Sequence, residues 1–138
     1  MSFAGVRNGL DQYNQNAVRT GVDSASPHRL IQMLLEGALD KIAVAKGYME
    51  RGDIQPKGAQ IGAAISILEG LKASLDKEKG GEIAQNLEDL YIYMERRLFE
   101  AHVGNDPGLL DEVSDLLKQI KEAWDAIADQ AAGQAPSA

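Results

Sequence analysis

Residues 75–98 read LDKEKGGEIAQNLEDLYIYMERRL, and they carry the clearest structural signal in the chain. Gly80 and Gly81 can adopt the positive φ that ends a helix, a conformation that most side chains resist. The apolar residues that follow recur at helical spacing and mark one core-facing stripe: Ile83, Leu87, Leu90, Tyr91, Met94 and Leu98. The stretch therefore predicts the end of one helix and an amphipathic helix after it.

Two helices are predicted before the glycine pair. The first begins with Ser26 as N-cap and Pro27 at the first helical position, and it ends near residues 51–53. The second begins at Pro56 and is expected to continue to about residue 79. A loop of only a few residues between them favours antiparallel packing.

Two more helices complete the predicted bundle. The third follows the glycines to about residue 103, and the fourth begins with Asp106 as N-cap and Pro107 at its first position. Because no β alternation occurs, the predicted fold is all-α, an antiparallel four-helix bundle over residues 26–130.

The ends of the chain lie outside this bundle. Residues 1–25 carry scattered apolar side chains, Leu10 and Tyr13 among them, and are expected to form an additional helical segment packed on the bundle. Residues 131–138 are uncharged, small and proline-containing, which favours a disordered tail.

Composition limits the class of protein. A chain of 138 residues forms one domain, and the absence of cysteine excludes disulfides and thiolate metal sites. The first residues lack the apolar core of a signal peptide, and no apolar run reaches the roughly 20 residues of a membrane span. We therefore expect a cytoplasmic protein without membrane insertion. The net charge of −7, concentrated after residue 80, argues against nucleic acid as a partner.

The sequence contains no recognisable catalytic motif. His28 lies in a first helical turn, where capping or solvent contact is the simplest role, and His102 lies near a helix end, where a cation complements the dipole. No Glu-x-x-His pair, phosphate-binding glycine loop or nucleophile motif occurs. We therefore expect that the protein is not an enzyme and that it binds no metal or cofactor.

Surplus apolar surface points to a binding function. A bundle helix needs an apolar stripe a little over 100° wide. The apolar residues of the predicted first helix cover an arc wider than half its circumference. Leu35, Leu39 and Ile42 lie in this arc. We interpret these residues as part of a groove that contacts a partner.

The second and third helices extend this predicted groove. On the second, Gly62, Ser66 and Gly70 recur every four residues beside Ile67, and such small residues allow another backbone to approach closely. On the third, Ile92 and Phe99 lie opposite the core stripe. The groove could instead be covered by the N-terminal segment or by a second subunit.

The sequence also resembles a known family. Residues 75–98 are similar to the flagellin-specific export chaperones called FliS, and the likeness continues in register along the chain. Residues 26–39, beginning SPHRLI, resemble the family's second helix, and Tyr13 resembles its N-terminal tyrosine. Residues 105–107 and 123–124 resemble the borders of its last helix.

This resemblance implies a cytoplasmic flagellar secretion chaperone. It implies that the partner is the C-terminal segment of flagellin, held so that it does not polymerise before export, with flagellar export gate components as possible further partners. It also implies that the segment around Leu10 and Tyr13 covers the groove until flagellin displaces it. Many members carry an aromatic residue at the position of Leu35 and an acidic one at that of Ile92.

Two other functions remain open on the sequence alone. A structural adaptor would use the surplus apolar face as a homodimer interface in the free state. A histidine phosphotransfer domain is also an acidic helical bundle, but it needs an exposed histidine in mid-helix, and His28 lies in a first turn followed by Arg29-Leu30-Ile31.

Overall fold

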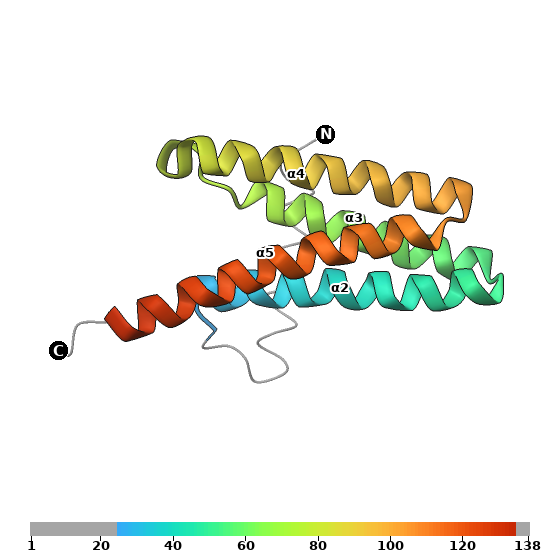
Figure 1. Ribbon diagram of the computed structural model, residues 1–138, viewed down its shortest axis with the longest axis horizontal. Helices are drawn as coiled ribbons and strands as arrows, with labels where there is room; N and C mark the ends of the chain where they lie inside the picture. The colour runs from blue at the N-terminus through green and yellow to red at the C-terminus, as the bar shows by residue number, and fades with distance from the viewer. Residues whose placement is uncertain (1–24, 135–138) are drawn as a thin grey trace.

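The computed structural model describes residues 25–134, with side chains described as far as residue 127. This part contains four helices and no strand: α2 (Pro27–Arg51), α3 (Ile54–Ala73), α4 (Lys77–Gly104) and α5 (Pro107–Gln134). They run alternately up and down, as Figure 1 shows. The predicted all-α class is confirmed. Residues 1–24 of the predicted N-terminal segment and residues 135–138 of the predicted tail lie outside the described residues, whereas residues 131–134 of that tail continue α5.

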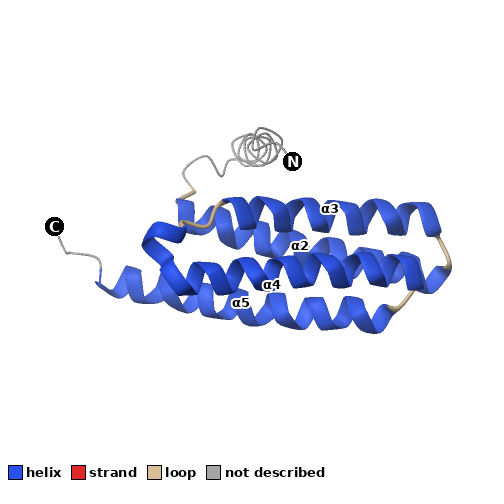
Figure 2. Ribbon diagram, turned by 90° about the horizontal axis from the view of Figure 1, so that it is seen from above, coloured by secondary structure: helices blue, strands red, loops and turns tan. Residues whose placement is uncertain are grey.

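The helices enclose one core. α2 packs on α3 and α5, and α4 packs on the same two helices, so the four surround the bundle axis. Figure 2 shows the four helices lying lengthwise along one another. The largest fully buried side chains come from all four helices: Leu35, Ile42, Leu68, Leu71, Met94, Leu98, Leu110, Val113 and Leu117.

Local capping explains where α2 and α5 begin. Pro27 occupies the first turn of α2, and the Ser26 Oγ accepts a hydrogen bond from the Arg29 N–H at 3.1 Å. At the start of α5, the Asp106 carboxylate accepts one from the Gly108 N–H at 2.9 Å. Both predicted starting points are therefore confirmed.

The junction between α3 and α4 differs from the prediction. α3 ends at Ala73 rather than near residue 79, because Asp76 begins a new helix by accepting a hydrogen bond from the Lys79 N–H at 3.1 Å. The glycine pair consequently lies inside α4 instead of ending a helix. Gly81 has φ 52° and ψ −124°, so the predicted positive φ is present but serves as a break within α4.

The break also corrects the predicted core stripe. Tyr91, Met94 and Leu98 are buried as expected, but Ile83 is 73% exposed. Ile83 follows the non-helical Gly81 by only two residues, so it lies at the end of the bundle where no further core exists to cover it.

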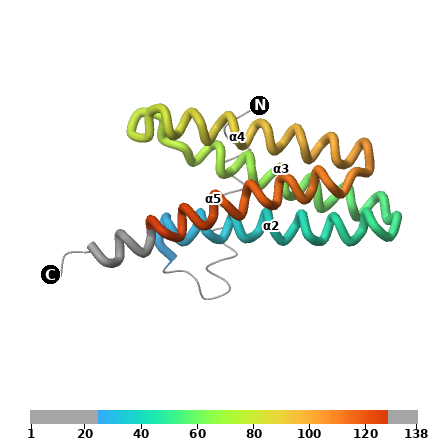
Figure 3. Tube along the Cα trace, in the orientation of Figure 1, coloured from blue at the N-terminus to red at the C-terminus, as the bar shows by residue number. Residues whose placement is uncertain are grey.

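A buried lysine joins α3 to the end of α4. The Lys57 Nζ donates hydrogen bonds to the His102 carbonyl at 3.1 Å and to the Asn105 Oδ1 at 3.0 Å, and the residue is only 3% exposed. Its positive charge meets the carbonyl-rich C-terminus of α4, which is an electrostatically favourable position. This contact lies at the end of the bundle that also holds the α2–α3 and α4–α5 connections (Figure 3).

Two glycine substitutions distinguish the break from the small-residue surface. Gly81→Ala should lower the free energy of unfolding by about 1–3 kcal/mol, because a side chain resists its backbone conformation. Gly62→Ala should raise it by up to about 1 kcal/mol, since Gly62 is helical and no described atom lies within 4 Å of an added Cβ. Urea denaturation measures both, and equal effects of the two substitutions would contradict this account.

Candidate functional site

An apolar cavity of about 740 Å³ opens at one end of the bundle. This end brings together the start of α2, the α3–α4 junction and the C-terminal half of α5. The lining residues are Pro27, His28, Leu30, Ile31, Leu34, Leu35, Leu71, Ser74, Leu75, Asp76, Lys79, Gly80, Ile83, Ala84, Leu87, Tyr91, Ile120 and Trp124. Its size and apolar lining are typical of a binding pocket.

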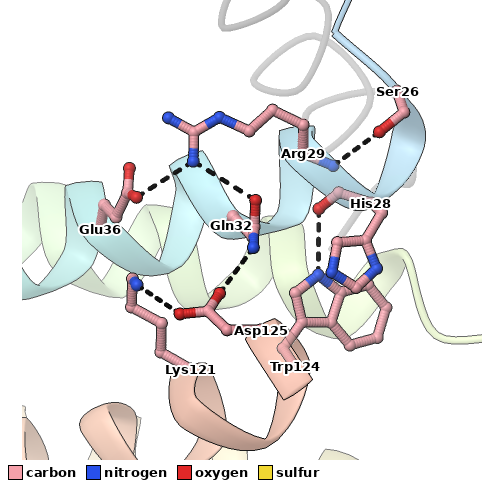
Figure 4. A network of polar contacts seen from close by, with 8 residues as sticks. All are labelled: Ser26, His28, Arg29, Gln32, Glu36, Lys121, Trp124 and Asp125. Atoms are coloured by element: carbon pink, nitrogen blue, oxygen red, sulfur yellow. Dashed lines mark hydrogen bonds and ion pairs between the residues drawn. The ribbon is translucent and has the colours of Figure 1, made fainter. Parts of the chain in front are cut away.

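A stacked pair of rings forms one wall of the cavity. The His28 and Trp124 rings lie 4.3 Å apart between centroids and are nearly parallel, at 8° (Figure 4). The Trp124 Nε1 donates a hydrogen bond to the His28 carbonyl at 3.0 Å, so the indole is held at both its face and its edge. The wall thus ties the first turn of α2 to α5.

Polar contacts behind this wall hold α2 and α5 together. The Gln32 Nε2 donates to the Asp125 carboxylate at 2.6 Å, and the Lys121 Nζ donates to the same carboxylate at 2.7 Å (Figure 4). The hydrogen bond from Lys121, joined by that from Gln32, lowers the pKa of Asp125 below its ordinary value. Arg29 extends the network along α2 to Glu36 at 3.1 Å. These charged groups of α2 and α5 are not among the lining residues, whose charged members are Asp76 and Lys79 at the start of α4.

Tyr91 and His28 add two buried polar groups to the lining. Burial raises the pKa of Tyr91 to about 12, so its hydroxyl stays neutral at any physiological pH. The His28 Nε2 is buried and has no hydrogen-bond partner among the described residues. Its lining position allows a bound group to supply the missing partner.

A second surface lies over the contact between α3 and α4. Lys57 reaches His102, and a Cβ on Gly58 would meet the His102 ring at 3.0 Å, so these positions are opposite each other in the antiparallel pair. One turn further along α3 is Gly62, and about one turn back along α4 is Phe99. Gly62 and Phe99 consequently lie at the same level of the bundle.

We call this surface the α3–α4 face and define it by Gly62, Ser66, Ile92 and Phe99. All four residues are exposed, Phe99 to 61%. The apolar residues of this set are on α4 and the small residues are on α3. These four predicted site residues are exposed, and their role in binding stays a prediction.

Other predicted site residues have different positions. Leu35 and Ile42 are 0% and 1% exposed, and Gly70 is also buried, which corrects their prediction as surface residues. The wide arc of α2 exists because α2 packs on both α3 and α5, and because Leu35 also lines the cavity. Leu39 and Ile67 are partly buried against the core.

The two N-terminal site residues cannot be placed. Leu10 and Tyr13 lie outside the described residues.

Sequence reasoning missed most of the cavity. The sequence predicts capping or solvent contact for His28 and a border of the last helix at residues 123–124, whereas His28 and Trp124 together form the wall. The topology offers a signal for the cavity. In an up-and-down four-helix bundle, the N-terminus of the first helix and the C-terminus of the last helix lie at the same end of the bundle. Apolar residues at both, such as Leu30 and Ile120, would have predicted an apolar end surface.

These features define a small helical-bundle protein with an open apolar cavity at one end. Residues 9–131 match the protein family described as flagellar protein FliS. The chain belongs to this family, which is one of flagellar secretion chaperones and not of enzymes. The resemblance and the chaperone class predicted from the sequence are thereby confirmed.

Individual relatives are similar over most of their length. The chain is 52% identical over 118 residues to the flagellar secretion chaperone FliSB of Pseudomonas aeruginosa, covering 86% of this chain and 94% of that protein. It is 48% identical over 127 residues to the flagellar secretion chaperone FliS of Salmonella typhimurium, covering 91% and 94%. The corresponding protein of Bacillus subtilis is 32% identical over 119 residues, covering 86% and 85%. Among the described helices, none is long and apolar enough to cross a membrane.

Replacing the indole tests the cavity wall. Trp124→Phe keeps a ring beside His28 but removes the donor to the His28 carbonyl, so the free energy of unfolding should fall by about 0.5–1.5 kcal/mol. The control is Tyr93→Phe, which removes an exposed hydroxyl that donates to Glu112 and should have a smaller effect. Thermal or urea denaturation compares them, and a larger loss for Tyr93→Phe would refute the proposed importance of the wall.

Proposed function

We propose that this chain binds the C-terminal segment of a flagellin in the cytoplasm and keeps it from polymerising before export. The observation that carries the proposal is the open apolar cavity in a member of a flagellar secretion chaperone family. Membership of that family implies a flagellar protein as client. Flagellin's C-terminal segment is the partner that the sequence resemblance implies.

The two surfaces supply complementary contacts for such a client. An amphipathic helix or extended segment can insert large apolar side chains into the cavity, where each Å² of apolar area removed from water contributes roughly 25 cal/mol. The α3–α4 face offers small residues, which let a second backbone come close beside Phe99. A client that is unfolded before binding loses conformational entropy, which reduces the net affinity.

The N-terminal segment is proposed to cover the cavity when no client is bound. Pro27 and His28 line the cavity, so residues 1–25 join the bundle at the cavity itself. An extended chain of the 24 undescribed residues spans about 80 Å, so its reach does not limit which part contacts the cavity. Leu10 and Tyr13 are the side chains we propose for this contact, because tyrosine can bury its ring while its hydroxyl remains in water.

The binding proposal is tested with a peptide. A synthetic C-terminal flagellin segment from the source organism should bind one-to-one, and calorimetry should show the negative heat-capacity change of apolar burial. Ser66→Lys should weaken binding at least tenfold, about 1.4 kcal/mol, because a charge would enter the contact on the α3–α4 face. The bundle should stay folded, since Ser66 is exposed.

Gln119→Lys provides the matched control for Ser66→Lys. Gln119 is exposed on α5, so this variant adds the same charge away from the α3–α4 face. Equal weakening by both variants would show that charge alone matters and would remove the α3–α4 face from the site. Failure of every flagellin segment to bind at micromolar concentration would refute the client itself.

Deleting residues 1–20 tests the proposed cover. The cap formed by Ser26 and Pro27 remains, so the bundle should fold, but the cavity should be exposed and the truncated chain should self-associate. Affinity for the flagellin segment should be unchanged or higher, because no resident segment has to be displaced.

Ultracentrifugation and hydrogen exchange decide this second test. A truncated chain that remains monomeric, with unchanged exchange in α2 and α3, would contradict the cover. A full-length chain that is already a stable dimer would favour a homodimer interface in the free state.

A further inference from the structure

Three charged side chains meet between α3 and α4. The Lys72 Nζ lies 3.0 Å from the Glu69 carboxylate on its own helix and 3.5 Å from the Glu95 carboxylate on α4. Their side chains are between 16% and 20% exposed. One ammonium group is therefore placed between two carboxyl groups at a largely buried helix contact.

Two carboxyl groups share one ammonium group, so the cluster would carry one unbalanced negative charge if both were ionised. The Glu69 Oε2 and the Glu95 Oε1 are buried and form no hydrogen bond among the described residues, and the Glu95 Oε1 has only its 3.5 Å ion pair with the Lys72 Nζ. Because Glu69 and Glu95 meet at one ammonium group, a hydrogen bond between their carboxyl groups would satisfy these oxygens. Two ionised carboxylates cannot form such a bond, because both only accept. A single proton held between them would supply the missing donor.

Electrostatic surroundings favour a proton on Glu95. Burial, followed by the hydrogen bond and charge of Glu69, raises the pKa of Glu95 to about 7. Burial also raises the pKa of Glu69, but the hydrogen bonds from Glu95 and Lys72 outweigh it, so the pKa of Glu69 is lowered. The opposite directions are those expected of two carboxyl groups that share one proton.

Among the described residues, no second cation forms an ion pair with Glu69 or Glu95. Glu88, about two turns from Glu95 towards the start of α4, forms its ion pair with Lys77 at 2.8 Å. On the flank of α4 that faces α5, Arg97 is occupied by Glu100 and Glu112 at 2.8 and 2.7 Å. Lys72 is thus the cation that the described ion pairs place on Glu69 and Glu95.

We propose that the contact between α3 and α4 holds one exchangeable proton, shared by Glu69 and Glu95, and that its release to water loosens this contact. Loss of the proton leaves two negative carboxylates facing each other with one ammonium between them. Repulsion between the carboxylates then favours separation of the helices.

The proposal concerns the free chain and goes beyond the binding of a client. Glu69 follows Ser66 by three residues, and Glu95 lies between Ile92 and Phe99, so the pair sits beneath the α3–α4 face. An effect of pH on client binding would rest on the proposed function, but the proton itself would not.

The direction of the pH effect follows from proton linkage. The folded chain binds this proton more tightly than the unfolded chain, whose glutamate titrates in the ordinary acidic range. The stabilisation is therefore complete at acidic pH and is lost as pH rises through about 7. The lowered pKa of Glu69 acts only in the acidic range and does not alter this window.

The experiment compares urea denaturation of the full chain at pH 6 and pH 8. The shared proton should increase the unfolding equilibrium constant about tenfold between these values. Glu95→Gln should remove that tenfold component, because its amide donates a hydrogen bond at either pH. Glu100→Gln removes a carboxylate from the same helix without touching the pair, and should retain the pH dependence of the unmodified chain.

Carbon-13 NMR of the side-chain carboxyl groups provides the direct measurement. Glu95 should titrate near pH 7 in the unmodified chain and move to lower pH in Glu69→Gln, which removes the neighbouring negative charge. A Glu95 titration in the ordinary acidic range would overturn the proposal. The same conclusion would follow if Glu95→Gln kept the pH dependence, or if Glu100→Gln lost it as well.

Discussion

Lys57 extends from the first turn of α3 to the last turn of α4 and places a buried ammonium group on a helix C-terminus. Burying a cation without a carboxylate is costly unless its N–H groups find acceptors, and here the His102 carbonyl and the Asn105 side chain provide them. Because these partners occupy one position, α3 and α4 cannot slide past each other without leaving the charge unsatisfied. This register brings Gly62 level with Phe99 and Glu69 next to Glu95.

The two ends of the bundle consequently have different characters. One end is closed by two short connections and by the Lys57 contact. At the other, α2 begins, α5 continues past its neighbours (Figure 1), and the α3–α4 junction contains a break at Gly81. Apolar side chains such as Ile83 reach this end without a core to cover them. An open cavity here is therefore a property of the chain's local conformation and does not require a partner to create it.

Helix positions were largely predictable from sequence, because their signals are local. Ser26-Pro27 and Asp106 each act within one turn, and both mark true helix starts. The end of α3 was missed because two local signals competed, and the Asp76 cap acted before the glycine pair. Binding residues were harder, since helical periodicity gives the direction of a side chain but not its level along the bundle. Ile42 on α2 and Gly70 on α3 are both buried, which only the packing of these helices shows.

Residues of the cavity wall were missed for a related reason. His28 and Trp124 are 96 positions apart in the sequence, and no local sequence pattern contains both of them. Their stacking also has an optical consequence. Trp124 is the single tryptophan of the chain, so all indole fluorescence originates from the rim of the cavity. The molecule therefore carries one intrinsic indole probe at the place where a bound client would change the polarity around the ring, and no second tryptophan contributes to its signal.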